Sequence, residues 1–245
     1  MRMRLDRWLT TLGVCSRSEG KDLIRKGAVW VNAAPQRDPT ALVETERDQL
    51  RVRDQAVDGR ILRHVVMHKP AGILTAARDR KQPTVMDLLP PVYGAIGCMP
   101  VGRLDKDTTG ILFFTCDGEL NHRLLAPGRH VEKVYEAEVT GRLGEQEVQA
   151  FADGLALSDF TAQTSVLEIL EAGAETSRAR VTVAEGKFHQ IKRMFSATGH
   201  EVQRLHRLRF GPLTLDSELA EGAWRELTAA EVQALRQAAG MEAEL

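Results

Sequence analysis

The feature that most constrains the fold is a polar loop framed by two glycines and followed at once by an apolar run. Residues 102–110 read Gly-Arg-Leu-Asp-Lys-Asp-Thr-Thr-Gly, with two carboxylates, two cations and two hydroxyls between the glycines. Ile111–Phe114 follows directly and is the longest apolar run. Such a run predicts a buried strand, and functional groups concentrate in loops braced against a rigid sheet. We therefore expect the chemistry at residues 102–110.

The residue types of this loop leave three functions open: binding a cation, binding phosphate, or supplying a carboxylate nucleophile. Its acids do not follow the Asp-x-Asp-x-Asp-Gly spacing with a distal Glu that calcium loops use. The Gly-x-x-x-x-Gly-Lys order of a Walker phosphate loop is absent. The calcium interpretation is therefore weak, and a Walker loop is excluded.

Around this loop, strand and helix patterns mix without a regular alternation. A strand at 65–67 ends at the turn-forming sequence Lys69–Gly72. We expect further strands at 73–75, 111–115, 133–140 and 179–183, and helices at 85–89, 120–125, 146–153, 189–198 and after a cap at Thr228. This order favours an α+β domain with a mostly antiparallel mixed sheet flanked by helices.

The first sixty residues predict a separate small module of two short helices and a few strands. Apolar residues at 5, 8, 9 and 12 follow helical spacing, and Ser16 with Glu19 forms a capping box for a second helix that ends at Gly27. Strands at 29–31 and 50–53 follow, with a turn at 32–35, and the polar segment Asp54–Arg63 is the expected linker. A chain of 245 residues has room for both parts, which we place at 1–60 and 61–245.

The net charge of −1 hides a strong regional asymmetry. Residues 1–60 hold twelve Lys and Arg against nine Asp and Glu, residues 186–210 hold six against one, and residues 213–245 hold two against seven. A polyanion would bind the first two regions and avoid the third. Basic clusters that are only solvated surface explain these counts equally well.

Several common classes of protein do not fit the sequence. Cys15, Cys98 and Cys116 lie far apart, which argues against disulfides and a cysteine zinc site and favours a reducing, cytoplasmic setting. We expect Cys98 and Cys116 to be buried apolar residues. No run is long enough to cross a membrane or to form a secretory signal. The histidines at 189, 200 and 206 match no zinc spacing, so no metal is expected.

Three blocks of the N-terminal module resemble the S4 RNA-binding domain: Leu5–Leu9, Ser16–Glu19 and Ile24–Asn32. The resemblance implies binding to structured RNA through the helices and the glycine turn. Arg17, Arg25 and Lys26 are then expected RNA contacts. A generic pair of capped helices is the alternative that the residues alone leave open.

Gly102–Gly110 resembles the signature loop of the pseudouridine synthases of the ribosomal small-subunit type, a family that joins an S4 domain to a catalytic domain. The likeness continues at Met67–Gly72, Thr115–Glu119, Glu132–Tyr135, Gly186–Phe195 and Leu205–Arg207, and with the S4 blocks it covers nearly the whole chain. It implies that a uridine base of ribosomal RNA detaches, rotates and rejoins through carbon, without a metal or an organic cofactor.

Within this resemblance, Asp105 corresponds to the nucleophile because it directly follows Arg-Leu, and Asp107 is the less favoured candidate. A carboxylate nucleophile must stay ionised in a partly dry pocket, although desolvation favours the neutral form. Lys192 corresponds to the family's basic residue, which opposes that effect, with Arg193 held in reserve. Neighbouring residues cannot share one helix face, so at most one of the two is expected to reach Asp105.

The resemblance also implies the other site residues. Tyr135 corresponds to a pocket tyrosine whose ring stacks on the flipped uracil, and Leu205 to an apolar floor. Arg103 is expected next to the flipped base, where extrusion leaves a gap to fill and phosphates to hold. Lys187 and Arg193 are further expected RNA contacts. For Tyr135 without the motif, a core position in a strand is the alternative.

Three functions fit the sequence. The first is a ribosomal RNA pseudouridine synthase, and residues 126–130 and 186–190 favour 16S RNA over the alternative, a uridine of 23S RNA. The second is a non-catalytic S4-type assembly factor, and the third is a nucleoside-cleaving hydrolase. Intact Asp105, Tyr135 and Lys192 favour the enzyme. The expected partner is 16S ribosomal RNA or a ribosomal subunit assembly intermediate, not a membrane, and the lack of a heptad seam favours a monomer.

Overall fold

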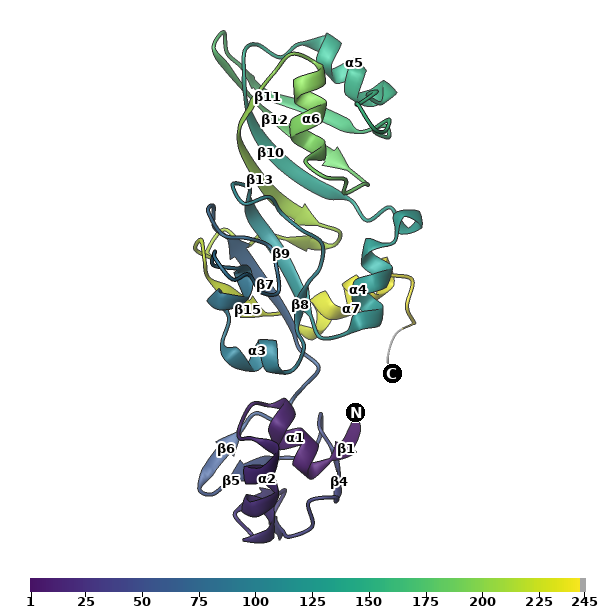
Figure 1. Ribbon diagram of the computed structural model, residues 1–245. Helices are drawn as coiled ribbons and strands as arrows, with labels where there is room; N and C mark the ends of the chain where they lie inside the picture. The colour runs from purple at the N-terminus through teal and green to yellow at the C-terminus, as the bar shows by residue number, and fades with distance from the viewer. Residues whose placement is uncertain (243–245) are drawn as a thin grey trace. The chain divides into compact units, whose positions relative to one another are not determined.

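The computed structural model describes residues 1–242, which form two compact units (Figure 1). One unit contains Met1–Arg63 together with Leu89–Met99, and the other contains the rest of the described chain. The sequence did not indicate that Leu89–Met99 belongs with the N-terminal residues. None of the helices within residues 1–242 is long and apolar enough to cross a membrane.

The first unit combines short helices with two small antiparallel sheets. Its helices are α1 (Leu5–Thr11), α2 (Arg17–Arg25) and α3 (Pro91–Ala95). One sheet pairs β1 (Arg2–Arg4) with β4 (Leu42–Glu44), and the other has the order β3 (Ala34–Gln36), β2 (Val29–Val31), β5 (Leu50–Val52) and β6 (Gln55–Val57). The expected helices and the strands β2 and β5 are confirmed, whereas β1, β3, β4 and β6 were not expected.

Local sequence patterns account for this unit, but the pattern at residues 54–63 was misinterpreted. The capping box of α2 is confirmed, because the Ser16 backbone N–H donates to Glu19 at 2.9 Å and the Ser16 hydroxyl accepts from the Glu19 N–H. The expected linker at 54–63 is wrong, since β6 lies within it and Trp8 Nε1 donates to the Gly59 carbonyl at 2.7 Å. Polar turn residues of a hairpin gave this segment the composition of a linker.

The second unit is built on one large sheet. Its strand order is β11 (Val166–Ala172), β12 (Thr176–Val183), β10 (Lys133–Thr140), β13 (Val202–Phe210), β9 (Thr109–Thr115), β7 (His64–Lys69) and β15 (Trp224–Glu226). Two short strands lie off this path: β14 (Leu213–Thr214) pairs with β13, and β8 (Met99–Pro100) pairs with β9. Strands β9 and β13 run parallel, and the pairs on either side of them are antiparallel. The expected α+β fold with a mostly antiparallel mixed sheet is confirmed.

The core of this unit consists of two clusters of buried residues. Each cluster packs against two helices, whose positions Figure 1 shows. The first lies under α5 (Glu145–Asp153) and α6 (Gln190–Ala197), and the second under α4 (Gly118–Leu125) and α7 (Ala229–Ala238). Two single-turn 3₁₀ helices, η1 (Val85–Leu88) and η2 (Pro127–Arg129), complete the elements. Strand β13 gives Leu205 to the first cluster and Phe210 to the second. The β9–β13 pair therefore lies where the two clusters meet.

Most predicted elements of this unit are confirmed, and the errors have local causes. Residues 73–75 form no strand beyond a single bridge between Leu74 and Thr84, and the Thr75 hydroxyl donates to the Leu104 carbonyl at 2.8 Å. Residues 85–88 form the expected short helix, which is a 3₁₀ helix. Strands β11 and β13, the second of which contains His206, were not expected.

Gly110 sits where the loop enters the parallel β9–β13 pair. Its φ of 110° is unfavourable for other residues, and its partner in the register is Arg207. A Cβ at this position would overlap the carbonyl oxygen and amide nitrogen of Arg207. Backbone cannot yield as a flexible side chain can, so only glycine lets the two strands approach this closely.

Replacing Gly110 with Ala is therefore expected to lower the free energy of unfolding by roughly 2–4 kcal/mol, through steric overlap and an unfavourable φ. Chemical denaturation followed by circular dichroism measures this change. Gly118→Ala is the matched control, because a Cβ at Gly118 meets nothing within 4 Å. Equal stability of the two variants would contradict the close approach of β9 and β13.

Candidate active site

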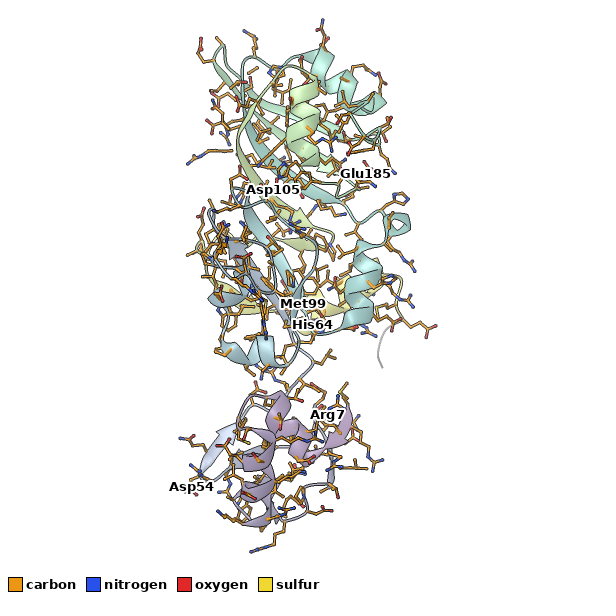
Figure 2. All side chains as sticks on the ribbon, in the orientation of Figure 1. Arg7, Asp54, His64, Met99, Asp105 and Glu185 are labelled. Atoms are coloured by element: carbon orange, nitrogen blue, oxygen red, sulfur yellow. The ribbon has the colours of Figure 1, made fainter. Side chains whose placement is uncertain are left out.

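A pocket opens where the loop before β9 meets β10, β13 and the segment leading into α6. Asp105, Tyr135 and Leu205, which were expected to share a site, all line it. The lining also includes Arg103, Leu104, Thr108, Val183, Glu185, Gly186, Lys187, His189, Gln190 and Ile191. Figure 2 shows Asp105 and Glu185 near the middle of the large sheet, where the two core clusters meet. Three segments far apart in the sequence thus converge on one carboxylate.

Asp105 lies between two nitrogen groups. Its Oδ2 is 3.4 Å from Lys192 Nζ, and its Oδ1 is 3.5 Å from His189 Nε2, which carries charge only when protonated. The Asp105 side chain is 25% exposed, so the carboxylate is partly desolvated but still faces the pocket. The site therefore holds an accessible carboxylate with a cation beside it.

Lys192 is shared between two carboxylates. Its Nζ lies 2.6 Å from Asp107 Oδ1, closer than its contact with Asp105, and this hydrogen bond lowers the pKa of Asp107. Asp107 is 73% exposed and is not part of the pocket lining. Of the two acids in the loop, Asp105 is therefore the one that lines the pocket, and Asp107 contacts the lysine from the solvent side.

Arg193 points away from Asp105. Its guanidinium pairs with Asp159, donates to the Ser158 hydroxyl at 3.0 Å, and lies 5.0 Å from the centre of the Phe160 ring. Of the two adjacent cations at the start of α6, only Lys192 reaches the pocket carboxylate. Arg193 instead orders the turn at residues 158–160.

A buried lysine supports the loop from below. Lys69 is fully buried, and its Nζ donates to the carbonyls of Pro70 at 3.0 Å, Lys106 at 3.2 Å and Thr108 at 2.9 Å. These bonds fix the backbone on both sides of Asp107. Sequence reasoning gave Lys69 no role, although a lysine at the end of an apolar strand was the available signal.

Two further buried cations lie behind the pocket wall. Lys133 donates to the Ala184 carbonyl at 3.2 Å, and Arg207 Nε donates to the Ile111 carbonyl at 2.9 Å. Burial lowers the pKa of both Lys69 and Lys133 to about 8. Part of the basic charge counted at 186–210 is therefore internal, since Arg207 is only 2% exposed.

The other expected residues lie in separate surroundings. Arg17, Arg25 and Lys26 are exposed on or just after α2 of the first unit. His200 Nδ1 contacts the Thr140 carbonyl and His206 Nδ1 contacts the Thr109 hydroxyl, so the histidines do not converge. Within residues 1–242, no group of three His, Cys, Asp or Glu side chains is placed to hold a metal. Cys98 is buried as expected, but Cys116 is partly exposed.

Comparisons with known proteins agree with this geometry. A family model described as RNA pseudouridylate synthase matches residues 63–197, and an S4 domain model matches residues 3–48. An uncharacterized RNA pseudouridine synthase of Bacillus subtilis is 37% identical, over 96% of this chain and 99% of its own. Ribosomal small subunit pseudouridine synthase A of Pseudomonas aeruginosa is 39% identical, over 94% of this chain and 99% of its own.

Solved structures give the same result. A structure described as the crystal structure of pseudouridylate synthase has a TM-score of 0.65 to this chain at 31% identity, covering 95% of this chain and 99% of that one. The similarity extends over both the S4-like part and the part that carries the pocket.

The buried lysines generate a testable dependence of stability on pH. The folded-state pKa of Lys133 is about 8, below the ordinary 10.5, so between these values the unfolded chain binds more protons. The free energy of unfolding should therefore rise from about pH 7.5 to about pH 9.5, by roughly 1–2 kcal/mol more in the wild type than in Lys133→Met. Urea denaturation at both pH values measures this difference. Identical pH dependence of the two proteins would contradict the assignment.

Proposed function

Because this chain belongs to the RNA pseudouridylate synthase family and carries an S4 domain before the catalytic domain, we propose that it converts a uridine of 16S ribosomal RNA to pseudouridine with Asp105 as nucleophile. The observation that carries this proposal is the position of Asp105 in the pocket, beside Lys192 and next to Tyr135 and Leu205. The name of the Pseudomonas relative supports a small-subunit target.

The proposed reaction balances within the substrate. The Asp105 carboxylate attacks C1′ of the ribose, the bond from C1′ to N1 breaks, and uracil leaves as an anion. The base turns so that C5 faces C1′. A bond from C5 to C1′ then forms as the aspartyl ester breaks, the C5 proton is released, and N1 takes up a proton. Because the substrate and the product are isomers, the scheme needs no external oxidant or reductant.

The pocket residues take distinct roles in this scheme. Lys192 places its cation 3.4 Å from the Asp105 carboxylate and helps to hold that side chain in the pocket. The Tyr135 ring and the Leu205 side chain enclose the uracil, which must leave the RNA stack to reach the pocket. Arg103, exposed at the pocket edge, is available to the phosphates beside the extruded nucleotide.

The S4 domain supplies a second contact with RNA. Arg17, Arg25 and Lys26 are exposed, and Arg25 has only a 3.9 Å contact with Asp22, so they are available to phosphates. We place the monomeric protein in the cytoplasm with naked 16S RNA or an assembling subunit as its partner. A uridine of 23S RNA is the second candidate target, because the catalytic loop itself carries no information about the subunit.

Tritium release from transcripts labelled with [5-³H]uridine tests the nucleophile. Asp105→Asn should lower turnover by roughly 10³-fold or more while RNA binding persists, because the nucleophile is lost and the basic surface is not. Asp107→Asn is the matched control, since Asp107 does not line the pocket. Normal turnover by Asp105→Asn, or equal losses in both variants, would contradict the assignment.

Lys192 and Arg193 form a second matched pair. Lys192→Met should lower turnover, because the Asp105 carboxylate loses the cation 3.4 Å away. Arg193→Met should leave turnover at saturating RNA close to that of the wild type, because Arg193 pairs with Asp159. Tritium release at saturating RNA separates the two variants. A loss of turnover in the Arg193 variant alone would overturn the assignment of Lys192.

Neutralising Arg17, Arg25 and Lys26 together should weaken RNA binding and flatten its dependence on salt by about one unit of slope per lost phosphate contact. Filter binding of a 16S transcript at several salt concentrations measures both quantities. An unchanged slope would show that this face of the S4 domain does not touch the RNA.

A further inference from the structure

Phe188 is the most exposed Phe, Tyr or Trp residue within residues 1–242. It is 71% exposed, and within residues 1–242 every other Phe, Tyr and Trp side chain is buried or half-buried. Its ring stacks on His189, with ring centres 3.8 Å apart and planes 17° from parallel. One face of this two-ring stack is therefore open to solvent. Single exposed apolar side chains are common, so the position of the stack matters more than the exposure.

The stack begins at the pocket and ends outside it. His189 lines the pocket and places Nε2 3.5 Å from Asp105 Oδ1, whereas Phe188 does not line the pocket. The Phe188 ring therefore lies beside a residue that lines the pocket, without lining the pocket itself. Any group that stacks on Phe188 is held next to the pocket.

The turn that carries the two rings is held in place before any ligand binds. Gln190 is buried; its side chain accepts from the Lys187 N–H at 3.0 Å and donates to Glu185 at 2.9 Å. His189 has a φ of 51°, in the left-handed region, which turns the backbone between Phe188 and α6. A preorganised aromatic surface loses little conformational entropy when a ligand stacks on it.

The surroundings of Phe188 select a negatively charged partner rather than an apolar peptide. Lys187 and Arg103 are exposed at the same pocket edge, and neither has a carboxylate contact among the ion pairs of the described residues. Exposed aromatic rings interleaved with cations are the pattern with which proteins bind unpaired nucleotides, because rings stack on bases while cations hold phosphates.

We propose that Phe188, backed by His189, is a stacking platform for an unpaired base of the substrate RNA that lies next to the extruded uridine. The proposal rests on the proposed function for the identity of that uridine. The platform contributes binding and orientation of the neighbouring nucleotide, and it takes no part in bond making. In the complex with RNA, the stacked base would cover the exposed face of the Phe188 ring.

The test compares Phe188→Ala, Phe188→Trp and the control Val166→Ala with the wild type. Val166 is 64% exposed on β11 and does not line the pocket. The probes are unmodified 16S and 23S transcripts labelled with [5-³H]uridine. Filter binding over a range of salt concentrations gives Kd and its salt slope, and tritium release gives KM and kcat.

Phe188→Ala should weaken transcript binding and raise KM roughly 5- to 100-fold, the range for the loss of one base stacked on an aromatic side chain. Its salt slope should equal that of the wild type, because no charge is removed. Phe188→Trp should restore binding, and Val166→Ala should change nothing. This pattern separates stacking from the charge contacts of the S4 domain.

Three results would overturn the platform: unchanged Kd and KM in Phe188→Ala, a reduced salt slope, or failure of Phe188→Trp to restore binding. Unchanged binding of naked transcripts with weaker binding of assembling subunits would assign Phe188 to a protein contact instead. Should the wild type release tritium neither from the transcripts nor from assembling subunits labelled in the same way, the proposed function fails, and the binding comparison still decides whether Phe188 stacks on RNA.

Discussion

The contact between Gly110 and the backbone of Arg207 is the constraint on which the pocket depends. It joins β9 to β13, the parallel pair between the two core clusters, over a register of only two residue pairs. Strand β13 then pairs with β10 on its other side, placing Arg207 opposite Tyr135 and Leu205 opposite Ala137. The loop that ends at Gly110 is thereby brought in front of Tyr135 and Leu205. A side chain at this crossing would move the Asp105 carboxylate away from the Tyr135 and Leu205 side chains that line the same pocket.

Four cations lie around the Asp105 carboxylate, and three of them are buried. Lys69 is buried beneath the loop and bonds to its carbonyls, Lys133 and Arg207 are buried behind the pocket wall, and Lys192 stands at the side. Burial of these cations costs free energy that hydrogen bonds to backbone carbonyls only partly offset. Their retention in one region is consistent with a site that must stabilise anions. Asp107 takes the shorter contact with Lys192, at 2.6 Å, and Asp105 takes the longer one, at 3.4 Å.

The sequence predicted the fold class and the convergence of Asp105, Tyr135 and Leu205, because apolar periodicity, capping residues and family motifs are local signals. It failed where long-range pairing decides the outcome. Strand β13 carries arginines and a histidine, so its alternation was hidden until its partners β9 and β10 were known. The hairpin strand β6 had the composition of a linker, and residues 73–75 found only a single bridge, between Leu74 and Thr84. The choice between Lys192 and Arg193 depended on side-chain direction, which spacing alone does not give.

The central claim is that this site isomerises a ribosomal uridine through Asp105. Site-resolved mapping of pseudouridines in ribosomal RNA, from cells with and without the protein, tests it most directly, because a carbodiimide adduct on pseudouridine stops reverse transcription. The account predicts that one stop in 16S RNA disappears without the protein and returns with the wild type but not with Asp105→Asn. A stop lost from 23S RNA would contradict the assigned subunit. An unchanged pattern in both RNAs, or restoration by Asp105→Asn, would contradict the claim itself.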